Sequence, residues 1–101
     1  MRAGAPARGH NGRTMQRVTV YSAAWSALAE PTRRFLEMRA IAFEVVDIND
    51  VPGGRDELLA RTGSRELPQI VIGSTPIGGY SELVRLEWLG RLAPLLDTAS
   101  E

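Results

Sequence analysis

The sequence predicts an α/β domain with a four-stranded mixed sheet flanked by helices, in the order β-α-β-α-β-β-α. Short runs of β-branched residues alternate with segments whose apolar residues repeat at helical spacing. Glycine and proline separate these segments, and only a short turn joins the last two runs. The chain has 101 residues, the length of one small domain. The first two strands, joined by a helix, should therefore be parallel, and the last two should form a hairpin.

The first half of the domain is expected to contain two strands and two helices. They are predicted as a strand at residues 18–21, a helix at 30–41, a strand at 43–48 and a helix at 55–62. In the first helix, Phe35 and Met38 lie at helical spacing, with arginine and glutamate on the outer side. Pro31 is expected to be the first helical residue, where its missing N–H removes no hydrogen bond. Gly63 is expected to end the second helix.

The second half is expected to contain a hairpin and a last helix. Residues 69–72 are typical of a strand, residues 73–76 of a hairpin turn, and Ile77 lies in a short fourth strand. Ser81 is a favourable N-cap for the last helix, which is rich in leucine. Gly90 interrupts this helix, and the leucines after it continue the apolar side.

The composition excludes several functional classes. Twelve basic and twelve acidic side chains cancel, so no overall field favours nucleic acid or an anionic membrane. The chain has no cysteine and one histidine, His10, which excludes disulfides, thiolate chemistry, iron–sulfur clusters and a Ser-His-Asp triad. No apolar run is long enough for a membrane span or a secretory signal. We therefore expect a cytoplasmic protein without a metal. All of its basic side chains are arginine, which indicates the codon usage of a GC-rich, bacterial genome.

Residues 1–16 differ in composition from the rest of the chain. They combine three arginines with glycine, alanine and proline, and they contain no acidic residue. Such a segment buries too little apolar surface to offset the entropy of ordering. We therefore expect a disordered basic tail at residues 1–16, or a misassigned start with Met15 as the true first residue. A basic contact arm is the alternative, and residues 17–97 form the expected domain.

Two segments of the second half resemble motifs of the glutaredoxin family, in the thioredoxin superfamily. Residues 66–73, Glu-Leu-Pro-Gln-Ile-Val-Ile-Gly, resemble that family's Thr-Val-Pro-Gln-Ile-Phe-Ile-Gly. Residues 77–83, Ile-Gly-Gly-Tyr-Ser-Glu-Leu, are similar to its Ile-Gly-Gly-x-x-Asp-Leu. The resemblance implies a thioredoxin-like fold whose four strands have the order 2-1-3-4. It also implies a cis peptide bond between Leu67 and Pro68.

The catalytic motif of the family is missing. Glutaredoxins carry Cys-x-x-Cys or Cys-x-x-Ser after the first strand, where this chain has Ser26-Ala27-Leu28-Ala29. Thiol–disulfide exchange needs a thiolate that forms a mixed disulfide, and serine has neither an accessible anion nor a disulfide state. Ala23 stands where the family has a lysine, and Glu66 where it has a threonine. The resemblance therefore implies no catalytic residue here, with Ser26 and Ala29 at the positions of the two cysteines. Pro31 should also delay or kink the helix that follows.

Part of the family's glutathione site is retained. By resemblance, the glutathione-binding positions are Arg55, Leu67, Pro68, Gly79, Tyr80 and Ser81. Arg55 would hold the glycine carboxylate with paired hydrogen bonds, although it is equally explained as a solvated helix residue. The N–H groups of Tyr80 and Ser81 would receive the γ-glutamyl carboxylate at a helix start. Because the lysine is replaced, we expect weak glutathione binding. Because cysteine is absent, we expect no metal or iron–sulfur cofactor.

Three functional hypotheses remain open. The first is a redox-inactive module that binds glutathione or a protein partner at the former active-site face. The second is enzymatic, because serine-type glutathione transferases use a serine hydroxyl to hold the glutathione thiolate, and Ser26 could do so. Against it, the chain lacks the helical second domain of those enzymes. The third is a contact surface for another protein formed by Trp25, Leu28 and Tyr80.

Overall fold

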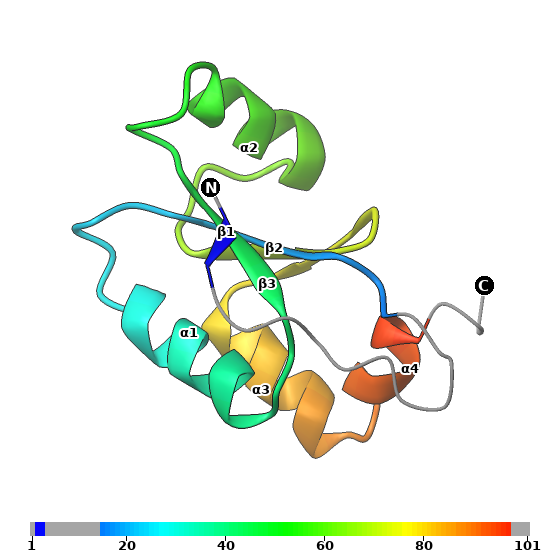
Figure 1. Cartoon of the computed structure of the whole chain (residues 1–101). Coiled ribbons are helices and arrows are strands. Elements are labelled where there is room, and N and C mark those ends of the chain that lie inside the picture. The colour runs from blue at the N-terminus through cyan, green and yellow to red at the C-terminus, as the bar shows by residue number, and fades with distance from the viewer. Residues whose placement is uncertain (1, 4–14, 98–101) are drawn as a thin grey trace.

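The β-α-β-α-β-β-α core forms as the sequence predicts, in a computed structural model that describes residues 2–3 and 15–97 (Figure 1). The elements are β1 (Arg2–Ala3), β2 (Val18–Ser22), α1 (Ala29–Met38), β3 (Phe43–Asp47), α2 (Gly54–Thr62), β4 (Gln69–Ile72), β5 (Thr75–Gly78), α3 (Tyr80–Trp88) and α4 (Leu92–Leu96). The sheet order is β1-β3-β2-β4-β5, with β2 and β3 parallel and the other pairs antiparallel. The predicted order of the four core strands is therefore confirmed.

The helices cover both faces of the sheet. Figure 1 shows α2 on one face and α1, α3 and α4 on the other. Side chains of β4 alternate between the faces: Ile70 and Ile72 pack in the core with α1, α3 and α4, whereas Val71 packs with Leu58 of α2. This period of two is what a strand buried on both faces requires. The sheet thus carries two apolar cores, and the smaller one lies under α2.

The N-terminal segment contributes a strand that the sequence does not predict. Arg2–Ala3 pairs antiparallel with β3, so the sheet has five strands rather than four. Residues 1 and 4–14 of the expected tail lie outside the described residues, whereas Met15 and Gln16, also expected in the tail, contact the end of the domain, with Met15 in a bridge to Asp97. Gln16 N–H donates to the Leu96 carbonyl over 2.7 Å, which joins the start of the core domain to the end of α4.

Several predicted helix ends are wrong by one to three residues. α1 begins at Ala29, so Pro31 is the third helical residue rather than the first. The first turn needs none of its own N–H groups for helical bonds, so it accepts proline there. α1 also ends at Met38, because Ala40 adopts a left-handed conformation with φ of 57° and Ile41 N–H donates to the Leu36 carbonyl.

The hairpin and the last helix also differ in detail. The turn is limited to Gly73 and Ser74, because Thr75 already pairs with Ile72 in the ladder. α3 begins at Tyr80, so Ser81 lies inside the first turn and is not the N-cap. Gly79 is the N-cap, and its N–H donates to Glu82 Oε1 over 2.8 Å. Glu82 therefore makes the reciprocal contact of a capping box, to the N–H of the N-cap residue, and the expected serine cap does not form.

Candidate functional site

The loop between β2 and α1 holds the tetrad of residues 26–29. Ser26 N–H donates to the Ala23 carbonyl over 2.9 Å, and Ala29 N–H donates to the Ser26 carbonyl over 3.3 Å. These bonds form a turn, so the helix starts only at Ala29. The expected delay of the helix is confirmed. Ser26 therefore lies ahead of the first helical residue, where the helix dipole acts on it weakly.

Ser26 has an unusual side chain. Its Oγ is buried and has no hydrogen-bond partner among the described residues. Most buried hydroxyls in proteins do have a partner. By contrast, Trp25 is 66% exposed and Leu28 is exposed beside it in the same loop. The tetrad therefore combines a buried, unpartnered hydroxyl with exposed apolar neighbours.

The loop at residues 67–68 and the start of α3 lie against each other. The Leu67–Pro68 peptide bond is cis, as the resemblance implies. A Cβ added to Gly79 would lie 3.1 Å from the Pro68 carbonyl oxygen, closer than side chains normally approach. Glycine is needed here because the two backbone segments almost touch. Pro68 and Gly79 are thus brought together, and Tyr80 and Ser81 follow Gly79 in the first turn of α3.

The N-terminus of α3 already contains a negative charge. Leu83 N–H makes the first helical bond, to the Gly79 carbonyl, which leaves the N–H groups of the first turn directed outward. Glu82 lies in this turn, and its carboxylate accepts the Gly79 N–H. A ligand carboxylate that binds at Tyr80 and Ser81 would meet the helix dipole but also the Glu82 charge. The helix dipole therefore favours an anion at this site, and the Glu82 charge opposes it.

Arg55, which is expected to hold the glycine carboxylate, lies in the first turn of α2. Its Nη2 donates to Asn49 Oδ1 over 2.7 Å, and its side chain is exposed. Asn49 in turn donates its N–H to Asp47 Oδ1 over 2.9 Å. The guanidinium has five N–H groups, so one bond to Asn49 leaves donors for a carboxylate. Leu67 packs against the apolar cluster that includes Ala23, which is buried where the family has lysine.

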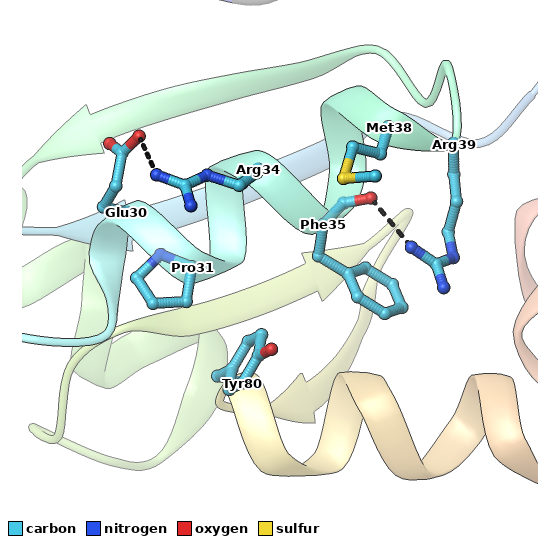
Figure 2. A pocket seen from close by; sticks show the side chains of 7 residues that line it. All are labelled: Glu30, Pro31, Arg34, Phe35, Met38, Arg39 and Tyr80. Carbon is cyan, nitrogen blue, oxygen red and sulfur yellow. Dashed lines mark hydrogen bonds and ion pairs between the residues drawn. The ribbon is translucent and has the colours of Figure 1, made fainter.

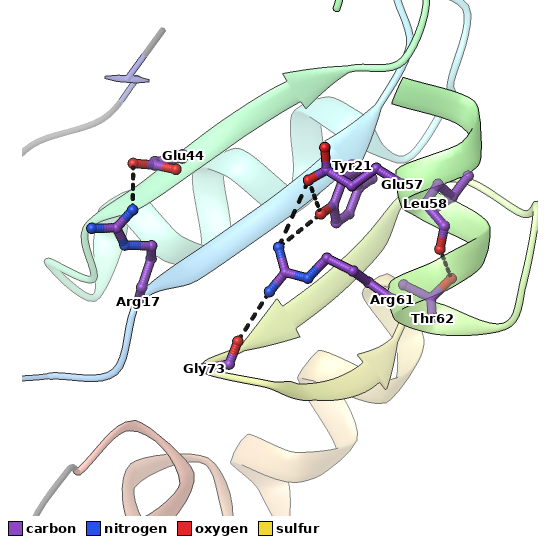
Figure 3. A network of polar contacts seen from close by, with 8 residues as sticks. All are labelled: Arg17, Tyr21, Glu44, Glu57, Leu58, Arg61, Thr62 and Gly73. Carbon is purple, nitrogen blue, oxygen red and sulfur yellow. Dashed lines mark hydrogen bonds and ion pairs between the residues drawn. The ribbon is translucent and has the colours of Figure 1, made fainter. Parts of the chain in front are cut away.

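A polar network under α2 is the main feature that the sequence analysis missed (Figure 3). Tyr21 is fully buried, and its hydroxyl donates to Glu57 Oε2 over 2.6 Å. Arg61 Nη1 donates to the same hydroxyl over 2.8 Å, and Nη2 donates to the Gly73 carbonyl over 3.0 Å. Burial, together with the bond to Glu57, raises the pKa of Tyr21 to about 12. The spacing of Glu57 and Arg61, four residues apart on a helix, is the sequence signal that could have indicated it.

The described part of the chain holds neither a candidate metal site nor a candidate membrane span. In residues 2–3 and 15–97, no three His, Asp or Glu side chains gather where they could hold a metal ion. The helices of this part are also too short or too polar to cross a membrane.

Comparisons with known proteins agree with the motifs and the fold. The family model for glutaredoxin matches residues 18–77. A glutaredoxin of Pseudomonas aeruginosa is 34% identical over 83 residues, which cover 82% of this chain and 99% of that protein. A glutaredoxin of Neisseria meningitidis is 31% identical over 84 residues, which cover 82% of this chain and 99% of that protein.

Solved structures give the same result. The solution structure of glutaredoxin from Brucella melitensis matches with a TM-score of 0.70 at 31% identity, and covers 85% of this chain and 94% of that one. A buckwheat glutaredoxin–glutathione complex matches with a TM-score of 0.69 at 22% identity, and covers 78% of this chain and 74% of that one. The second likeness supports the fold alone.

Proposed function

Because the chain belongs to the glutaredoxin family, we propose that it is a redox-inactive member that binds glutathione weakly through backbone groups. The chain has no cysteine, so none of its side chains can supply the sulfur of a mixed disulfide. Ser26 and Ala29 stand at the positions of the two cysteines. What remains of the family's site is the part that depends on the main chain.

The close approach of Gly79 to the Pro68 carbonyl is the observation that carries this proposal. It places the start of α3 beside the backbone of residues 67–68. An extended, peptide-like ligand can pair with the Leu67 backbone and direct a carboxylate to the N–H groups of Tyr80 and Ser81. These contacts need backbone geometry and no catalytic side chain, so loss of the cysteines does not remove them.

Charge sets the expected affinity. Ala23 supplies no cation, and Glu82 adds a negative charge at the start of α3. Arg55 is then the main positive contact for the glycine carboxylate. Loss of one charge-assisted hydrogen bond weakens binding by about 1.5–3 kcal/mol, or about ten- to a hundredfold. We therefore expect glutathione to bind in the millimolar range.

The test is a glutathione titration followed by the fluorescence of Trp25. A Trp88→Phe background removes the only other tryptophan, which is exposed on α3. Saturable binding that shifts the amide signals of Tyr80 and Ser81 in NMR spectra, without reduction of a small disulfide by glutathione, supports the proposal. No saturation at millimolar glutathione, or measurable disulfide reduction, would contradict it.

A second candidate function rests on the Ser26 hydroxyl. Because its Oγ is buried and unpartnered among the described residues, it has a hydrogen bond to offer a ligand. If that ligand is the glutathione sulfur, the O–H would stabilise the thiolate, which could attack an aryl chloride and release chloride. Conjugation by the wild-type chain that is lost in Ser26→Ala, together with a large loss of glutathione affinity, would favour this function over the inactive module.

A further inference from the structure

A groove lies between α1 and α3, outside the tetrad and the loop at residues 67–68 (Figure 2). Its volume is about 260 Å³, which suits one large side chain rather than a whole cofactor. Pro31, Phe35 and Met38 line it from α1, and Tyr80 lines it from α3. The Phe35 and Tyr80 rings meet edge to face, with centroids 6.4 Å apart. The groove therefore has a rigid, apolar floor.

Two arginines flank this floor. Figure 2 shows Arg34 and Arg39 on either side of Phe35. Arg39 is fixed: its Nε donates to Glu87 Oε2 over 3.2 Å, its Nη1 donates to the Phe35 carbonyl, and its guanidinium carbon lies 3.7 Å from the Phe35 ring centroid. Arg34 is more exposed, and its Nη2 lies 3.6 Å from Glu30 Oε2. Glu30 also lines the groove, and it is shared between Arg34 and Arg33, which lies 3.0 Å from it and pairs with Glu37 as well, over 3.8 Å.

The apolar surface continues beyond the groove along α3. Tyr80, Val84 and Trp88 follow each other at intervals of four residues, so they lie along one side of the helix. Trp88 is 87% exposed, and Met38 across the groove is 78% exposed. Trp88 follows Tyr80 by eight positions, which is about 12 Å at the helical rise. This strip is too long for a small molecule that occupies the groove.

We propose that the groove and the strip formed by Tyr80, Val84 and Trp88 bind an acidic peptide segment of a partner protein. One large apolar side chain of the segment fills the groove, and carboxylates next to it pair with Arg34 and Arg39. The pre-fixed Arg39 loses little side-chain entropy on binding, and exposed tryptophans next to pockets commonly dominate such interfaces. The balanced charge of the whole chain makes nucleic acid a poor occupant.

The probe is a fluorescein-labelled amphipathic peptide of about four helical turns, with leucine and phenylalanine on one face and glutamate on the other. Its binding to the full chain is measured by fluorescence anisotropy. We expect saturable binding that Trp88→Ala weakens about tenfold and Arg34→Glu at least about fivefold. Both residues are exposed, so circular dichroism should show the variants to be folded.

Two matched controls separate the groove from general surface effects. Arg33→Glu changes the same charge on α1 and breaks an ion pair with the same Glu30, but Arg33 does not line the groove. Trp25→Ala removes the other exposed tryptophan, which lies in the tetrad loop. Each control should change the affinity less than about twofold.

Several results would overturn the proposal. Lack of saturation, equal binding of a peptide with lysine in place of glutamate, or equal effects of Arg33→Glu and Arg34→Glu would each do so. Sedimentation of a dimer that Trp88→Ala dissociates would assign the surface to a second copy of the chain. Binding to anionic phospholipid vesicles without peptide binding would assign it to a membrane. Because none of these measurements involves glutathione, they are independent of the proposed function.

Discussion

Two parts of the molecule differ in how much of the family's sequence they retain: the loop at residues 67–68 with the start of α3, and the loop at residues 26–29. The loop at residues 67–68 and the start of α3 are in close contact at Pro68 and Gly79, and the proposed glutathione site consists of backbone groups there. The loop at residues 26–29 is the place where the family relies on side chains, and here it carries serine and alanine. A site built from backbone persists as long as the turns and close approaches persist. A site built from a sulfur is lost with one substitution.

Of the substitutions considered in these two regions, Gly79→Ala should have the largest effect on stability and on glutathione binding. Gly79→Ala places a Cβ 3.1 Å from the Pro68 carbonyl oxygen, so backbone must move. We expect a loss of about 1–3 kcal/mol in the free energy of unfolding, together with loss of glutathione binding. Denaturant unfolding measures the first, and the Trp25 titration measures the second. Ala27→Ser in the tetrad loop is the control and should change stability by less than about 0.5 kcal/mol. Equal effects at both positions would remove the distinction between the two regions.

The network under α2 shows that side chains can also be essential when they are buried. Tyr21→Phe removes the hydroxyl that contacts Glu57 and Arg61. We expect a loss of about 1–2 kcal/mol in the free energy of unfolding, since each such hydrogen bond contributes about 1 kcal/mol. Thermal or denaturant unfolding at neutral pH checks this value. An unchanged free energy of unfolding would mean that the Tyr21 hydroxyl does not contribute to the stability of α2 beyond Glu57 and Arg61.

The same network predicts a dependence on alkaline pH. The pKa of Tyr21 is raised to about 12 in the folded protein, whereas an unfolded tyrosine has a pKa of about 10. The unfolded chain therefore releases this proton first, and the contribution of the group to stability falls as pH rises from about 10 to 12. Wild type should lose stability in this window more steeply than Tyr21→Phe. Parallel curves would show that the phenol titrates normally.

The predictable parts of the structure are those with local signals. Periodicity and glycine or proline punctuation predict the four core strands and the end of α2 at Gly63, whereas the grouping of Pro68 with Gly79 is implied only by the resemblance to the family. The missed features depend on partners distant in sequence. β1 pairs with β3 across the chain, and Tyr21 meets Glu57 from another element. No property of either residue alone indicates the contact.

The helix ends were missed for a different reason. Ala40 adopts the left-handed conformation usually taken by glycine, so the end of α1 has no sequence signal. Ser81 is a favourable cap by residue type, but Gly79 takes that position and Glu82 provides the contact. For the site, the sequence indicates which residues come together at the start of α3. It does not indicate that Arg55 contacts Asn49.

A substitution of Arg55 tests whether the proposed glutathione site depends on any side chain, because Arg55 would be the one side chain that binds the ligand. Arg55→Ala should weaken glutathione binding about tenfold or more through loss of a charge-assisted hydrogen bond. Asn49→Ala should weaken it much less, because it frees Arg55 rather than removing it. Titration of both variants by Trp25 fluorescence gives the two affinities. If Arg55→Ala binds like the wild type, Arg55 is a solvated residue and the site is built from backbone alone.

The smallest effects are expected at Ser26. Ser26→Ala should change glutathione affinity less than about twofold, since the hydroxyl makes no hydrogen bond to a described residue and the carboxylate contacts remain. A large loss of affinity would instead make Ser26 a partner of the glutathione sulfur. That result would favour the conjugating function over the inactive module.

Ser26→Cys should likewise fall far short of the activity of a glutaredoxin. The new thiol would occupy the place of a buried hydroxyl, ahead of a helix that begins only at Ala29. Burial raises a thiol pKa, and the distant helix start does little to lower it. Ala29→Cys is the informative control, because that thiol would sit at the first helical residue. Titration with a thiol-reactive dye across pH should therefore give a lower pKa for Ala29→Cys than for Ser26→Cys. The reverse order, or rapid disulfide reduction by Ser26→Cys alone, would show that the loop still activates the first position of the tetrad.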